Sequence, residues 1–286
     1  MNDLKKVMEP MSLSDIQFMF NRALSLTFVR KKLLLAFTML AFCGLLVVFF
    51  RGLAINAGQW MVMSLTFLPF FLCAGVLLSM GILLIRIYHD EIKEKLVSYT
   101  EVLSKSWEVV IGASYFSIPI ILSYLLLWIF LGIFVMLKQI PSVGDIFAVI
   151  LAFGPFLLNL GSIALCLLNL GLLFFITPIV ALKGANRTRV TQNLIRRLKV
   201  DVFSNVILAL FALLPFLAVT GLLLFAAFLT GTVCYSCENP LHNVMQWFFI
   251  MIPFTALLSP TVVFFFNFAA ESHVFMQRMV QPKNGS

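Results

Sequence analysis

Charged side chains are scarce in this sequence. Asp, Glu, Lys and Arg make up 11% of its 286 residues, and hydrophobic residues make up 62%. A soluble domain usually contains about 25% charged residues, because its surface must face water. The composition therefore excludes an ordinary water-soluble globule and predicts a protein whose solvent is lipid.

Six long stretches contain no Asp, Glu, Lys or Arg. They are longer than the roughly 10 residues of a membrane β-strand and do not alternate in polarity, which favours helices over a barrel. A helix of about 17 to 25 residues spans the hydrocarbon core. We therefore expect an all-α integral membrane protein with six transmembrane helices. The stretches are Leu33 to Phe50, Trp60 to Ile85, Val109 to Leu137, Ile146 to Leu182, Val202 to Thr230 and Val244 to Ala270.

The fourth stretch, Ile146 to Leu182, has 37 uncharged residues. As one straight helix it would be about 55 Å long, far more than the hydrocarbon core. Gly154 and Pro155 are the expected point of breakage, because proline interrupts the helical hydrogen bonds. We expect the span proper to begin near Phe156, after a re-entrant or interfacial piece.

Lysine and arginine predict the orientation. Of the 20 such residues, 18 fall on the side of the chain start, and the other side has Arg51 and Lys138. Cytoplasmic loops carry this excess in membrane proteins, so we expect both termini to be cytoplasmic. The orientation accounts for the net charge of +8, so this charge does not indicate a nucleic-acid partner. A basic cluster on that side is also a candidate for contacts with anionic lipid headgroups: Lys183, Arg187, Arg189, Arg196, Arg197 and Lys199.

An amphipathic segment precedes the first, third and fifth stretches. The segments are Ser12 to Lys32, Ile92 to Trp107 and Arg189 to Asp201, and the first opens with Ser12 and Asp15 at the spacing of a helix start. A Pro-Phe pair recurs in each returning stretch. We expect three helical hairpins, each preceded by a cytoplasmic amphipathic helix, in a single membrane domain over residues 1–286 with repeat units 12–88, 89–183 and 184–274.

Polar side chains recur at helical spacing along the fourth stretch. They could line the path of a small solute, or form hydrogen bonds between helices worth about 0.6 kcal/mol each. We favour helix packing, because solute and proton paths usually contain an ionisable residue and none lies within a predicted span. The residues are Asn159, Ser162, Cys166, Asn169 and Thr177.

The loop before the sixth stretch holds the one concentrated set of candidate ligands. Cys234 and Cys237 form a C-x-x-C pair, followed by Glu238 and His242. On the outer side a disulfide is the first interpretation, while unlinked thiols and a metal or redox site are alternatives. A structural zinc site needs four ligands, so we expect no metal and no cofactor. We also find no H-E-x-x-H, G-x-S-x-G or P-loop motif and expect no enzyme.

The segment Asn21 to Lys32, the Phe- and Leu-rich spans and the three-hairpin plan resemble uncharacterised multi-pass bacterial membrane proteins, among them the chlamydial kind. The resemblance implies a place in the bacterial inner membrane or, for a secreted protein, in a host-derived membrane. It implies no activity.

Two hypotheses of function follow. The first is a non-catalytic scaffold or assembly subunit that binds a membrane-protein partner or forms a homo-oligomer. The second is a transporter or carrier of a small neutral or lipidic solute. Under either hypothesis we expect contact with the lipid bilayer and its anionic headgroups, and no nucleic acid.

Overall fold

The computed structural model describes residues 12–55, 57–94, 99–138, 140, 149, 153–184, 190–192, 194–195, 202–230 and 240–280. These residues are predominantly helical, and none of them lies in a strand. The helices are α1 (Leu13–Ser25), α2 (Arg30–Ala54), α3 (Gln59–Ile92), α4 (Tyr99–Ser114), α5 (Ile118–Lys138), α7 (Gly154–Lys183), α9 (Val202–Leu229) and α10 (Pro240–Val280).

Six of these helices are long and apolar enough to cross a membrane: α2, α3, α5, α7, α9 and α10. The prediction of a multi-pass helical membrane protein is confirmed at this level. Helices suit a bilayer because each one satisfies its own backbone hydrogen bonds.

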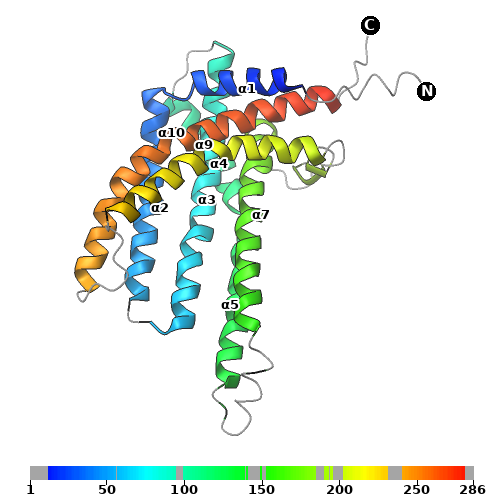
Figure 1. Ribbon diagram of the computed structural model, residues 1–286. Coiled ribbons are helices and arrows are strands. Elements are labelled where there is room, and N and C mark those ends of the chain that lie inside the picture. The colour runs from blue at the N-terminus through cyan, green and yellow to red at the C-terminus, as the bar shows by residue number, and fades with distance from the viewer. Residues whose placement is uncertain are drawn as a thin grey trace.

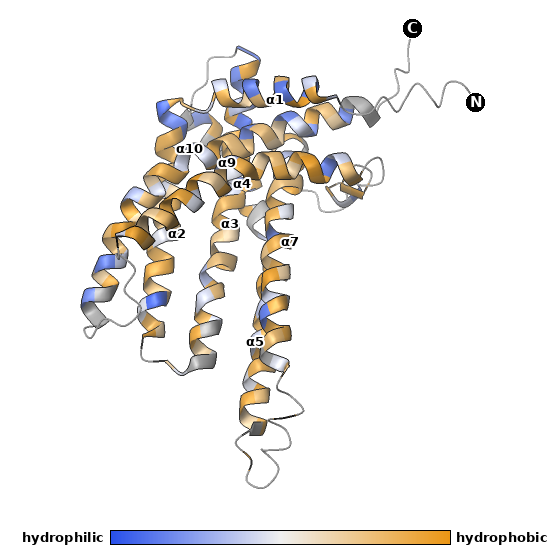
Figure 2. Ribbon diagram, viewed as in Figure 1, coloured by the Kyte–Doolittle hydropathy of each residue, from blue (hydrophilic) through white to orange (hydrophobic). Residues whose placement is uncertain are grey.

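Consecutive helices pack in pairs. Figure 1 shows α2 beside α3 and α5 beside α7, while α9 and α10 cross these pairs obliquely. The helix α1 lies across one end of the bundle, close to the end of α10 (Figure 1). Hydrophilic residues gather at the same end, and the lengths of the helices are mostly apolar (Figure 2).

The first amphipathic segment forms α1 as predicted. The Ser12 hydroxyl accepts from the Asp15 N–H at 3.3 Å, and the Ser12 N–H donates to the Asp15 carboxylate at 3.2 Å. This reciprocal capping box satisfies backbone N–H groups that a helix start leaves unpaired. The apolar stripe of α1 is buried at Ile16, Met19 and Ala23, and the helix packs against α10.

The helix α10 is 41 residues long and contains Pro253 and Pro260. Proline removes a backbone hydrogen bond and bends a helix, and α10 changes direction visibly along its length (Figure 1). This bend brings its second half across the bundle towards α1.

Residues 261–273 of α10, here called the central segment, are buried without exception. α10 packs against α1, α2, α3, α7 and α9. Aromatic rings fill much of this contact: the Phe20 and Phe264 ring centroids are 4.8 Å apart, and those of Phe174 and Phe265 are 5.8 Å apart. A helix that is apolar and covered all round is a core element.

Gly81 of α3 packs directly against the ring of Phe266 of α10. A Cβ atom added to Gly81 would lie 2.2 Å from the nearest ring atom of Phe266. Glycine is therefore required here for space, since any side chain would displace a fully buried ring.

Two predicted helix boundaries are wrong. The stretch Val109 to Leu137 is not one span, because residues 115–117 form a turn between α4 and α5. The stripe Ile92 to Trp107 is also broken: α3 continues to Ile92, and Glu94 then adopts φ 54°. The predicted start of the fourth span is confirmed, since α7 begins at Gly154 with Pro155 in its first turn. Most of the expected re-entrant or interfacial piece before it lies outside the described residues.

Candidate functional site

The end of the bundle beneath α1 contains charged side chains that pair with one another. We call Arg22, Lys32, Tyr88, Glu91 and Glu271 the charged cluster. The Lys32 side chain is fully buried and forms an ion pair with the Glu91 carboxylate. Its ammonium also donates to the Leu26 carbonyl at 2.9 Å and lies 5.3 Å from the centre of the Tyr88 ring.

A second branch of the charged cluster centres on Glu271. The Tyr88 hydroxyl donates to the Glu271 carboxylate at 2.9 Å, and the Arg22 guanidinium lies 3.6 Å from the same oxygen. Glu271 is thus shared between a residue of α3 and a residue of α1. One turn earlier on α10, the Asn267 amide donates to the Ala23 carbonyl of α1 at 3.3 Å.

Burying these charges is costly unless each has a partner, and here the ammonium and both carboxylates do. The charged cluster joins α1, α2, α3 and α10. Its geometry fixes the position of α1 on the bundle. Chemically, it is a set of paired ionisable groups at the end of three spanning helices.

Arg86 extends the polar contacts to two further helices. Its guanidinium donates to the Ala181 carbonyl of α7 at 3.0 Å and to the Ser106 hydroxyl of α4 at 2.8 Å. The same end of the bundle is therefore tied together by cations on α2 and α3.

The helices extend beyond the predicted uncharged stretches and carry ionisable side chains outside them. The candidate spans of α2, α3 and α10 include Lys32, Glu91 and Glu271. The helices continue beyond the uncharged stretches, because backbone hydrogen bonding does not stop where the apolar residues do. Spacing was the available signal: Tyr88 and Glu91, like Asn267 and Glu271, recur at intervals that place them on one helix face.

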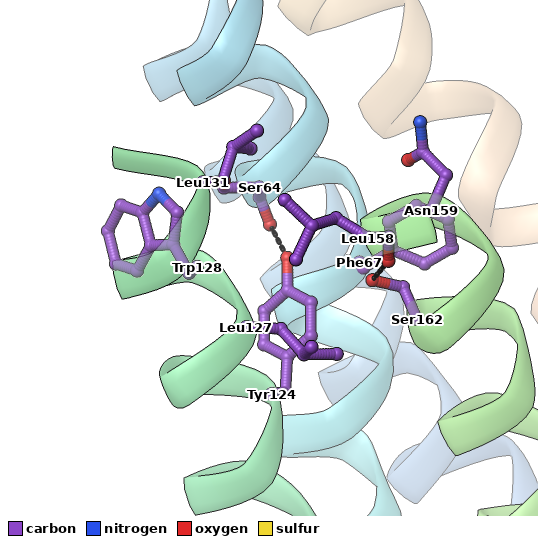
Figure 3. Close-up of a pocket in the computed structure, with 9 residues that line it drawn as sticks. All are labelled: Ser64, Phe67, Tyr124, Leu127, Trp128, Leu131, Leu158, Asn159 and Ser162. Atoms are coloured by element: carbon purple, nitrogen blue, oxygen red, sulfur yellow. Dashed lines mark hydrogen bonds between the residues drawn. The ribbon is translucent and has the colours of Figure 1, made fainter. Parts of the chain in front are cut away.

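The polar face predicted on α7 borders a small pocket between α3, α5 and α7 (Figure 3). Asn159 and Ser162 line it together with Tyr124 and Ser64, and its volume is about 20 Å³. That volume holds about one water. The Tyr124 hydroxyl donates to the Ser64 carbonyl, joining α5 to α3, whereas Ser162 donates to Leu158 within its own helix at 2.9 Å.

The other predicted residues of this face, Cys166, Asn169 and Thr177, do not line the pocket with Asn159 and Ser162. Cys166 contacts the aromatic cluster around Phe71 and Tyr124, Asn169 is half-buried, and Thr177 is fully buried. The Thr177 hydroxyl has no hydrogen-bond partner among the described residues. The structure places Asn159 and Ser162 together at the pocket, and leaves Thr177 near the other end of α7.

Other predicted site residues lie outside the described residues. This applies to Cys234 and Cys237 with their neighbour Glu238, and to Arg187, Arg189, Arg196, Arg197 and Lys199. The backbone of Lys183 ends α7, and His242 lies exposed near the start of α10. Within the described ranges, no group of three His, Cys, Asp or Glu side chains could hold a metal ion.

No protein-family profile, curated protein or solved structure matches this chain.

Proposed function

We propose that this chain is a non-catalytic multi-pass membrane protein that acts as a scaffold or assembly subunit. The contrast between its centre and its outer helices carries the proposal. The central segment of α10 is buried by the surrounding helices, whereas α9 buries only 11% of its most apolar stretch within the chain. A filled centre and uncovered outer helices suit assembly with other membrane proteins better than enclosure of a solute.

The exposed face of α9 is the surface on which this proposal can be tested. Its side chains include Phe225, which is 60% exposed, and Phe228, which is 80% exposed. A photo-crosslinking amino acid at position 225 should give one protein adduct of defined mass in native membranes. The matched position is Phe42 on α2, which is 51% exposed and should give lipid adducts alone.

Mass spectrometry identifies the adduct as a second copy of this chain or as another membrane protein. Either identity supports the scaffold role. Lipid adducts alone at position 225, together with a monomeric mass after mild extraction, would contradict it.

The proposed orientation places the α1 end of the bundle in the cytoplasm. The basic side of the sequence and the common position of the α1 start and the α10 end support this orientation (Figure 1). We further propose three hairpins, each preceded by an interfacial helix, in a bacterial inner membrane. A host-derived membrane is the alternative location.

A carrier of a small neutral or lipidic solute is the second candidate function. The charged cluster favours it, because ionisable residues on spanning helices often mark transport paths. The Asn159 pocket adds a polar site within the spans. In intact membranes, a Cys introduced by Asn159→Cys should stay unlabelled by a small hydrophilic thiol reagent if the bundle is a scaffold, and rapid labelling that a solute blocks would favour transport.

A further inference from the structure

A groove runs between α2 and α10 on the outside of the bundle. Its volume is about 130 Å³, and its walls come from residues 37–48 of α2 and 248–255 of α10. Gly44 faces Thr255: a Cβ at this position would make an ordinary van der Waals contact with the Thr255 methyl group, at 3.4 Å. The groove therefore follows a close contact between two spanning helices.

The groove offers nothing to a polar ligand along its length. Among the described residues that line it, Thr255 is the one polar residue, and the Thr255 hydroxyl donates to the Met251 and Ile252 carbonyls of its own helix at 2.9 and 3.0 Å. Apolar cavities of about 150 Å³ in other proteins stay dry and take up apolar guests. A groove with this lining on the lipid side of a bundle suits an acyl chain.

A cation lies at one end of the groove. Arg51 follows the groove residue Val48 by three positions, in the last turn of α2, and its guanidinium carbon is 5.8 Å from the centre of the Trp247 ring. Trp247 directly precedes the groove residue Phe248. Among the described residues, no carboxylate lies within ion-pair distance of Arg51.

The depth of this pair fits the level of lipid headgroups. Arg51 is near the end of one candidate span and Trp247 near the start of another. Tryptophan is enriched at the membrane–water boundary, and arginine extends its charge towards that boundary. Contact with the indole ring orients the guanidinium plane, whose N–H donors match the oxygens of a phosphate.

We propose that the α2–α10 groove binds an anionic phospholipid, with one acyl chain along the groove and the phosphate on Arg51. The site is separate from the charged cluster, since Arg51 lies in the last turn of α2 and Lys32 in its first. It does not depend on the scaffold role, since a carrier would have the same groove.

Native mass spectrometry of the full-length protein in detergent tests the proposal. Phosphatidylglycerol and phosphatidylcholine with identical acyl chains are added in equal amounts, and the ratio of the two bound lipids is measured. The wild-type protein should prefer phosphatidylglycerol. Arg51→Gln should reduce that preference about fivefold, as expected for the loss of one cation near an anionic headgroup.

Two matched variants separate the site from general charge and bulk effects. Lys138→Gln removes the other basic residue of that side from α5 and should leave the preference unchanged. Ala41→Phe fills the groove and should reduce retention of both lipids, whereas Ala164→Phe, on an exposed position of α7, should not.

Three results would overturn the proposal. They are an absence of headgroup preference in the wild-type protein, an equal loss of that preference in Arg51→Gln and Lys138→Gln, or unchanged lipid retention in Ala41→Phe. If Ala41→Phe does not fold, the comparison of Arg51→Gln with Lys138→Gln decides alone.

Discussion

The Lys32 side chain is fully buried, and its positive charge is compensated by the Glu91 carboxylate. Removing one partner of a buried ion pair leaves the other charge uncompensated and typically costs about 3–5 kcal/mol. Glu91→Gln should therefore strongly destabilise the protein. The double variant Lys32→Met with Glu91→Leu should recover most of the loss, since it removes both charges. Thermal unfolding in detergent measures both effects.

The control for this pair is Arg30→Met, because Arg30 is exposed at the start of the same helix. A surface change of this kind should stay within about 0.5 kcal/mol. Equal stability of Glu91→Gln and the wild-type protein would mean that the Lys32 charge is not held by Glu91.

Gly81 is a position at which the addition of one carbon atom should lower the stability of the protein. A methyl group there would overlap the ring of Phe266, since the added Cβ would lie 2.2 Å from it. Overpacking of this kind typically costs about 1–3 kcal/mol. Gly81→Ala should lower the unfolding temperature in detergent. Gly132→Ala is the matched variant and should be tolerated, because no described residue lies within 4 Å of its added Cβ. Equal behaviour of the two variants would contradict the packing of Gly81 against Phe266.

The residues of the charged cluster were individually visible in the sequence, but their association was not. Tyr88 and Glu271 are 183 positions apart, and nothing local links them. Their pairing follows from the bend in α10 and from its packing against α3. Asn159 and Ser162, in contrast, share one helix, and their common position was predicted from spacing alone.

At the scale of the element, local sequence signals were sufficient to predict α1. Its capping box is built from residues three positions apart, so both its existence and its start were predictable. The break between α3 and α4 was not, because the apolar stripe continues through it while the backbone turns at Glu94.

The cap of α1 gives a prediction for this element. Ser12→Ala removes the side-chain oxygen that accepts from the Asp15 N–H and should cost about 1 kcal/mol of helix stability. Amide hydrogen exchange in the first turns of α1 should accelerate, while α3 and α10 should remain unchanged. Ser25→Ala is the matched control, since the Ser25 hydroxyl bonds only to the Arg22 carbonyl at the exposed end of α1; acceleration in both variants would show that the cap is not the cause.

At the scale of the molecule, the six spans were predictable because lipid restricts a spanning segment to one kind of structure. The three proposed hairpins do not pack alike. The pair α9 and α10 crosses the other two pairs obliquely, and it alone provides the central segment (Figure 1). Within this pair, α10 contains two internal prolines and packs Phe266 against Gly81 of α3.

The orientation of the whole molecule can be tested with reporter fusions. Fusions after Leu137 and after Pro240 should report the outside, and fusions after Ile92 and after Arg189 should report the cytoplasm, because basic residues are retained on the cytoplasmic side. Activity measurements with paired reporters that work on opposite sides give the answer. A reversed pattern at any two positions would contradict the proposed orientation.

The central segment of α10 also has a consequence for biosynthesis. It follows the other described helices along the chain, so a ribosome makes α3 long before it makes Phe266 or Glu271. At the usual rate of about 5–20 residues per second, the delay is roughly ten to forty seconds. During that interval Gly81 faces an empty space and Tyr88 lacks its carboxylate partner on α10. Until α10 is made, the α2–α3 and α5–α7 pairs can already pack, but every contact that these helices and α1 make with the central segment is missing.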